Sequence, residues 1–172
     1  MKLFREILLI ALSASIIVSC SASKNLVPED KVTAVASYPC AEKGISDAEF
    51  FRACADATSS NISLAREKAV AKAKSSLGKT IVDKVLVAAE QENVSDKETF
   101  LKDIGVVSNK AIDIALKDIS PVCEKYSETN GRYTAYIAVE INRQNVFAVL
   151  NELLINNIPN FNKERFLKKI NE

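Results

Sequence analysis

Residues 49–87 constrain the fold more than any other part of the chain, because a strand pattern is followed there by a long helix pattern. The first part has the period of two expected of a half-buried strand, and the residues on one side are Phe51, Ala53, Ala55 and Ala57. In the second part apolar residues recur every four positions, as on the buried face of a helix; they are Ala65, Ala69, Ala73, Leu77, Ile81 and Val85. Both faces are small where they would meet, so we expect the helix and the strand to pack closely.

Capping and turn residues indicate the positions of the other elements. Asn61 or Ser63 can cap the first helix, which is expected to reach about residue 90, with Gly78 marking a close contact inside it. The further elements are a helix at about 95–117 that begins with the capping box Ser95-Asp96-Lys97-Glu98, strands at 121–126 and 132–142 around the turn Asn130-Gly131, and two helices capped by Asn142 and Asn162. Few strands and long helices predict an α+β domain of two layers, with the helices on one face of a small, mostly antiparallel sheet.

The first 20 residues match the pattern of an exported lipoprotein. Lys2 and Arg5 precede a 12-residue, mostly apolar run at 7–18, which is too short to span a bilayer comfortably and fits a secretory signal peptide at 1–19. The run ends in Ile17-Val18-Ser19-Cys20, which resembles the lipobox of bacterial lipoproteins and implies cleavage before Cys20 and acylation of that residue. Several acyl chains form a stable anchor where a single chain is marginal. The alternatives are an ordinary signal peptide that happens to contain Cys20, or an uncleaved anchor.

Residues 20–37 mix small, polar and charged side chains, and we interpret them as a lipidated tether in front of a single domain at 38–172. Position 21 is Ser rather than Asp, the residue that retains many such lipoproteins in the inner membrane, so we expect the outer membrane. No acidic cluster of the kind that directs some lipoproteins to the cell surface closely follows Cys20. This favours a domain that faces the periplasm, with the cell surface as the alternative.

The composition argues against catalysis, metal binding and nucleic-acid binding. The chain has no His, which is the commonest general base and the commonest metal ligand in proteins. Residues 20–172 carry 21 basic and 21 acidic side chains, so they have no net charge that would attract nucleic acid. The spacing Ser76-x-x-Lys79 matches one catalytic motif, but the companion motifs are absent and a solvated helix face explains it better. We therefore expect no enzyme activity, no cofactor, no metal site and no nucleic-acid partner.

Three cysteines remain after acylation of Cys20, and their spacing does not suggest a metal site. In an oxidising envelope compartment, one disulfide and one buried thiol is the simplest arrangement. Cys54 lies inside the first strand, where a bridge would need a partner directly across the sheet. Cys40 lies in a loop that can move to meet Cys123 near the start of a strand. We therefore expect a disulfide between Cys40 and Cys123 and a free, buried Cys54, with three free cysteines as the alternative.

Three features together resemble the LPP-twenty family of bacterial outer-membrane lipoproteins. They are the lipobox at Cys20, the strand Phe50-Phe51-Arg52-Ala53 that leads into Ser60-Asn61, and the spaced residues Ala65, Ala69 and Ala73. A later strand at 132–141 stands where that pattern would place it, and the layout is also similar to the N-terminal domain of the flagellar assembly protein T. The resemblance covers about residues 38–142 and implies a small α+β envelope domain without catalytic residues that could be carried over.

These observations lead to two functions from different classes. The first is a non-enzymatic, lipid-anchored envelope protein that contacts the membrane through Cys20 and docks a protein partner through its sheet face or its terminal helices. The second is a binder of a small or lipidic ligand between the helix layer and the sheet. An apolar cavity would favour the second function, and its expected lining is Leu77, Ile81, Phe100, Ile104 and Tyr133. A solid core with an exposed apolar patch would favour the first function.

Overall fold

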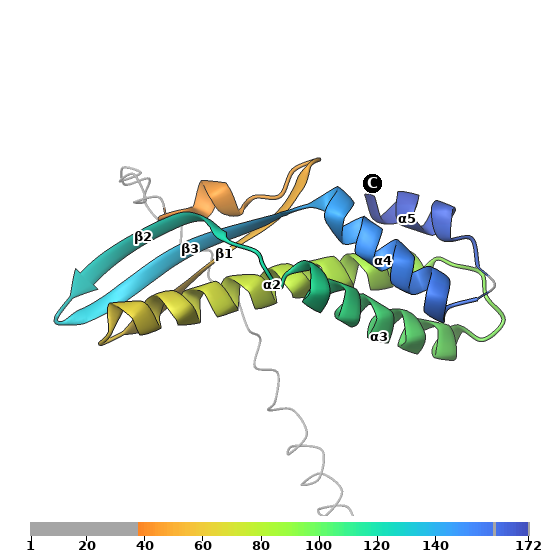
Figure 1. Ribbon diagram of the computed structural model, residues 1–172, viewed down its shortest axis with the longest axis horizontal. Helices are drawn as coiled ribbons and strands as arrows, with labels where there is room; N and C mark the ends of the chain where they lie inside the picture. Colours follow the sequence, from red (N-terminus) through yellow and green to blue (C-terminus); the bar gives the residue numbers. More distant parts are fainter. Residues whose placement is uncertain (1–37, 160, 172) are drawn as a thin grey trace, which may run out of the picture. The chain divides into compact units, whose positions relative to one another are not determined.

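The computed structural model describes residues 38–159 and 161–171 of the chain. The expected signal peptide, the acylation site Cys20 and the tether lie outside these residues. The described part contains, in chain order, η1 (Ala41–Gly44), β1 (Phe50–Ser59), α2 (Ile62–Glu90), α3 (Lys97–Ala115), β2 (Pro121–Thr129), β3 (Arg132–Asn142), α4 (Arg143–Asn157) and α5 (Lys163–Asn171) (Figure 1). The predicted α+β class is confirmed, because four α-helices pack with an antiparallel sheet of three strands.

The sheet has the order β1-β3-β2, so the last strand of the chain lies in its centre. β3 pairs antiparallel with β1 through registers such as Phe51 opposite Ile141, and with β2 through Thr129 opposite Arg132. Asn130 and Gly131 form the hairpin turn with φ angles of 52° and 72°, which are typical of a type I′ turn. A register shift between Pro121 and Cys123 marks a bulge at the start of β2.

α2 covers one face of the sheet, whereas η1 lies on the opposite face (Figure 1). The first half of α2 and the strands share one hydrophobic core, in which Ala65, Ala69 and Ala73 are fully buried. The predicted close contact between the alanine face of the helix and the first strand is therefore confirmed. Gly78 marks a second close approach, because a Cβ atom there would lie 3.0 Å from Cγ2 of Ile112 in α3.

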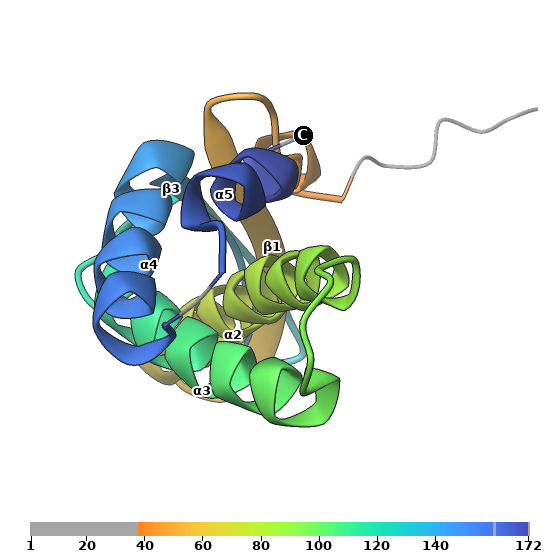
Figure 2. The ribbon, with the colours of Figure 1, turned by 90° about the vertical axis from the view of Figure 1, so that its right-hand side faces the viewer.

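The second half of α2 belongs to another core, which it shares with α3, α4 and α5. Figure 2 shows these four helices grouped around one another at the end of the domain away from the hairpin turn. The fully buried residues of this core are Val85, Ala89, Ile104, Ala111, Leu154 and Phe166. α2 is thus the element that joins a helix–sheet layer to a helical bundle.

The helix caps agree with the sequence predictions at three of four sites. Asn61, Asn142 and Asn162 each accept a hydrogen bond at their side-chain oxygen from a backbone N–H two or three residues later. The prediction for α3 is wrong, because its cap is Asp96 rather than Ser95. The Asp96 carboxylate accepts from the Thr99 N–H at 3.1 Å, and a negative charge is favoured at a helix N-terminus. α3 also ends at Ala115, two residues earlier than expected.

Candidate functional site: the disulfide and the neighbouring sheet edge

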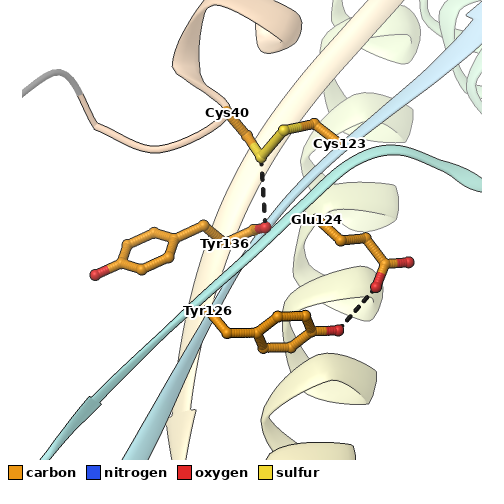
Figure 3. The surroundings of a disulfide bond; sticks show 5 residues. All are labelled: Cys40, Cys123, Glu124, Tyr126 and Tyr136. Atoms are coloured by element: carbon orange, nitrogen blue, oxygen red, sulfur yellow. Dashed lines mark hydrogen bonds between the residues drawn. A yellow bond between two sulfur atoms is a disulfide. The ribbon is translucent and has the colours of Figure 1, made fainter.

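The face of the sheet opposite α2 carries the pair of cysteines that the sequence analysis singled out. Cys40, just before η1, and Cys123, in β2, form a disulfide with an S–S distance of 2.05 Å and a Cα–Cα distance of 5.7 Å (Figure 3). They lie 83 residues apart in sequence. Cys40 is only 7% exposed, and the backbone carbonyl of Tyr136 lies 3.6 Å from its sulfur. The bridge therefore fastens the first described segment of the chain to β2.

Cys54 is free, as expected, but the prediction that it is buried is wrong, because the residue is only half-buried. Its place in β1 puts it on the face that α2 does not cover, opposite Ala138 of β3. η1 covers part of it, since a Cβ atom on Gly44 would lie 2.8 Å from the Cys54 sulfur. A turn of four residues shields a thiol less completely than a helix layer does.

Two tyrosines from different segments pack together beside the disulfide. The rings of Tyr38 and Tyr136 meet edge to face with their centroids 5.4 Å apart. The Tyr38 hydroxyl donates to the carboxylate of Asp56 at 2.8 Å. Burial of the ring and this hydrogen bond both raise the pKa of Tyr38 well above its usual value, so the phenol remains a neutral donor. The contact fixes the segment before η1 onto the sheet.

A surface cleft opens between this segment and β2, lined by Tyr38, Pro39, Cys40, Glu42, Lys125 and Tyr126. Tyr126 is 43% exposed, and its hydroxyl donates to Oε2 of Glu124 at 2.8 Å (Figure 3). Arg66 of α2 donates to both oxygens of the same carboxylate, at 2.7 and 3.0 Å. The hydrogen bond from Arg66 is the main reason that the pKa of Glu124 lies below its usual value. With Glu42 and Lys125 in its lining, the cleft combines aromatic surface, both signs of charge and a strand edge.

A second cluster of charged residues joins α5 to the corner between α2 and α3. Glu92 is only 4% exposed, and its carboxylate accepts from Arg165 at 2.6 Å and from Lys169 at 2.7 Å. Burial tends to raise the pKa of Glu92, but the two cations outweigh it and hold the pKa below its usual value. Lys97 donates to backbone carbonyls at the end of α2, including that of Glu90 at 3.0 Å. All these contacts hold helices together, which indicates a structural role.

The five residues that would line a ligand cavity, if the second function held, do not come together. Leu77 and Ile81 belong to the helix–sheet core, whereas Phe100 and Ile104 belong to the helical bundle. Leu77, Ile81 and Ile104 are fully buried among other side chains, and Tyr133 packs at the margin of the first core. These residues therefore do not line one cavity of the kind that would have favoured a ligand-binding function, since the two cores separate them along α2.

Comparison with known proteins does not assign this chain to a family. No family model matches it. No curated protein and no solved structure is similar enough to count as a match. Within residues 38–159 and 161–171, no helix is both long and apolar enough to cross a bilayer. In the same part of the chain, no three His, Cys, Asp or Glu side chains gather in a way that could hold a metal ion.

Sequence reasoning brought out Cys40 and Cys123 but not the groups around them. These groups are Tyr38, two residues before Cys40, and Glu124 and Tyr126, which follow Cys123 on β2. They lie near the cysteines in sequence but carry no motif that marks them as part of a site. The period of two in the second strand of the hairpin indicates on which face of the sheet each residue lies, and the turn dipeptide determines which residues of the two strands pair. Together these signals could have placed Tyr126 opposite Ala135, but they could not have placed Tyr38.

Proposed function

We propose that this protein is a non-enzymatic, lipid-anchored envelope protein whose domain faces the periplasm from the outer membrane and docks a protein partner. The anchor is inferred from the signal-peptide pattern and the lipobox that ends at Cys20. The docking role is inferred for the surface beside the disulfide, where exposed tyrosines, charged groups and a strand edge lie together. Aromatic residues of this kind are enriched at the centres of protein interfaces.

The observation that carries the proposal is the position of the disulfide. Cys40 lies three residues after the expected tether, and its bridge leads directly into β2. A domain held by its N-terminus experiences force at the first folded residues. The bridge would pass that force directly into β2, so that the segment before β1 would not be peeled away. This arrangement suits a domain that is tethered and holds a partner.

The alternative of a ligand bound between the helix layer and the sheet has less support. The small residues of α2 and of the strands fill that layer, and Ala65, Ala69 and Ala135 are fully buried. The cleft beside the disulfide lies at the β2 edge of the sheet, outside the helix–sheet layer, and is open to solvent. It suits a protruding side chain of a protein partner better than an enclosed lipid.

The anchor can be tested by labelling cells with radioactive palmitate. The unaltered chain should incorporate the label and appear in the outer-membrane fraction, whereas Cys20→Ala should give an unlabelled precursor. Cys54→Ala is the matched control, because it removes another cysteine outside the lipobox and should leave labelling intact. Equal labelling of Cys20→Ala and the unaltered chain would refute acylation at Cys20. Protease treatment of intact cells then separates a periplasmic domain, which would be protected, from a domain on the cell surface.

The docking role can be tested with a photoreactive amino acid placed at Tyr126. A discrete crosslinked protein is expected in the envelope, identified by mass spectrometry, and none is expected from the same probe at the exposed Ala71 of α2. Identical crosslinking from both positions would contradict docking at this surface.

A further inference from the structure

The two edges of the sheet differ in how far the chain itself occupies them. On β1, the hydroxyl of Ser46 accepts from the Arg52 N–H at 2.8 Å and donates to the Arg52 carbonyl at 3.3 Å. Farther along the same edge, Lys72 of α2 donates to the carbonyl of Asp56 at 3.0 Å. These side chains bond backbone groups that an added strand would need. The β1 edge is therefore closed by the protein itself.

The hairpin turn determines which backbone groups of β2 point away from the sheet. Thr129 and Arg132 flank the two-residue turn and are the pair that exchanges hydrogen bonds. Pairs alternate along an antiparallel ladder, so every second residue of β2 turns its N–H and C=O toward the free edge. These residues are Glu124, Tyr126 and Glu128. Within the described part of the chain, no hydrogen bond engages their backbone groups on that side.

We propose that the free edge of β2 receives an extended segment of a partner protein as a fourth strand, and that this segment carries basic side chains at alternate positions. The inference deepens the proposed docking function and rests on it. Main-chain hydrogen bonds to a strand edge supply affinity, and pockets for alternate side chains supply specificity. The cleft lined by Lys125 and Tyr126 opens directly beside this edge.

The charges along β2 argue against a second copy of this chain as the occupant. Two copies of β2 would pair antiparallel about a two-fold axis. An axis at residue 125 places Lys125 opposite its copy, an axis at 126 places Glu124 opposite Glu128, and an axis at 124 places Glu124 opposite itself. Each of these central registers sets like charges directly across the ladder, which is destabilising. The same charges reduce edge-to-edge aggregation.

The charges also indicate the chemistry of the partner strand. Glu124 and Glu128 lie on the face of β2 that is turned toward α2, with Tyr126 between them. Glu128 is exposed and makes no ion pair with the described residues, and Glu124 has only Arg66 as a cationic partner. Lys or Arg at two positions of the partner would stand near these carboxylates, and an apolar residue between them would contact the Tyr126 ring.

The proposal can be tested with the full chain in mild detergent and a synthetic peptide, acetyl-Thr-Lys-Thr-Val-Thr-Lys-Thr-amide. Peptide binding should slow amide hydrogen exchange at Glu124, Tyr126 and Glu128, and should leave unchanged the neighbouring amides that already bond to β3. A peptide with Glu in place of Lys should bind at least tenfold more weakly. A peptide whose alternate backbone nitrogens are methylated should not bind, because it lacks the donors that the edge requires.

A pair of variants separates the backbone of Tyr126 from its side chain. Tyr126→Val keeps the N–H, whereas Tyr126→Pro removes it at an edge position that does not bond to β3. Tyr126→Pro should lose peptide binding, while Tyr126→Val should retain most of it. Equal binding of both variants would overturn strand addition at this edge.

Three other outcomes would also refute the proposal. Exchange that is unchanged by any of the peptides would show that the edge takes no strand. Slow exchange in the free chain that depends on protein concentration would assign the edge to a second copy. Slow exchange that is independent of concentration and is lost on removal of residues 1–37 would assign it to the chain itself. None of these results bears on palmitate labelling, so the lipid anchor would stand or fall separately.

Discussion

The contact between α2 and the sheet should not tolerate a larger side chain at Ala69. Ala69 is fully buried in the helix–sheet core, to which the strands also contribute the small residues Ala53, Ala57 and Ala135. Because alanines stand on both sides, the backbones of helix and sheet approach closely. Ala69→Leu replaces a methyl group with an isobutyl group in this closely packed layer.

The expected cost follows from the packing of this layer. Inserting extra carbon atoms into a well-packed core typically costs about 1–3 kcal/mol, because side chains leave their preferred rotamers or the backbone shifts. For a domain of this size, each kcal/mol lowers the melting temperature by roughly 3–5 °C. We therefore expect Ala69→Leu to lower the melting temperature by about 3–15 °C.

The matched control is Ala71→Leu, which makes the same chemical change on the exposed side of α2. Surface substitutions usually change stability by no more than about 0.5 kcal/mol, and alanine and leucine are both good helix formers. Thermal and urea denaturation of the two variants, followed by circular dichroism, measures the difference. Equal melting temperatures for both variants would refute the close packing of α2 on the sheet.

Three further changes test other contacts. Glu92→Gln should lower the free energy of unfolding by about 1–3 kcal/mol near pH 7. Because the pKa of Glu92 is depressed in the folded state, its stabilising contribution is present above about pH 4.5 and is lost as the pH falls through the folded pKa. The stability of the variant should therefore decline less steeply in acid than that of the unaltered chain. Gly105→Ala should stabilise α3 by about 0.5–1 kcal/mol in urea denaturation, since the new Cβ would lie an ordinary 3.9 Å from Cδ2 of Leu86; a loss of stability would mean that α3 packs more tightly there. Peptide mapping of the non-reduced protein should recover Cys40 joined to Cys123, and a bridge that contains Cys54 would contradict the pairing; Cys123→Ala should then destabilise the domain by up to about 4.5 kcal/mol on the chain-entropy estimate for a separation of 83 residues.

Local signals in the sequence were sufficient for most of the fold. The alternation in β3 and the four-residue spacing in α2 each indicate which face of the element is buried. Each pattern can be recognised from the sequence of that one element alone. Helix caps are equally local, although Ser95 and Asp96 stand side by side and only the backbone geometry chooses between them. The exposure of Cys54 was missed for a different reason. Its burial depends on what covers the outer face of the sheet. That cover comes from η1, a short element outside β1, so the residue pattern of β1 alone could not predict it.

The site was less accessible to sequence reasoning, because its groups come from distant parts of the chain. The disulfide pair could be reasoned out, since three cysteines allow few pairings and a mid-strand cysteine has few partners. Glu92 offered no comparable restriction. Its two cations lie 73 and 77 residues later, on a helix whose docking position is set by the bundle core. The open edge of β2 likewise became visible only when the strand order placed β3 in the centre.

The disulfide and the open edge acquire a common meaning from their location on one strand. Cys123 lies in β2, the same strand whose outer edge is proposed to receive the partner, and Cys40 lies where the proposed tether enters the domain. Without the bridge, force between anchor and partner would pass from β2 through β3 to β1 and then back along residues 41–49, which are held only by non-covalent contacts such as those of Ser46 and Asp47 with Arg52. With the bridge, the same force passes from β2 to Cys40 through one covalent bond. The sheet would then bear no load across its hydrogen-bonded ladders, and the hydrophobic cores would be spared. The disulfide therefore suits the proposed tethered docking role, because it joins the segment before β1 covalently to the strand that is proposed to dock.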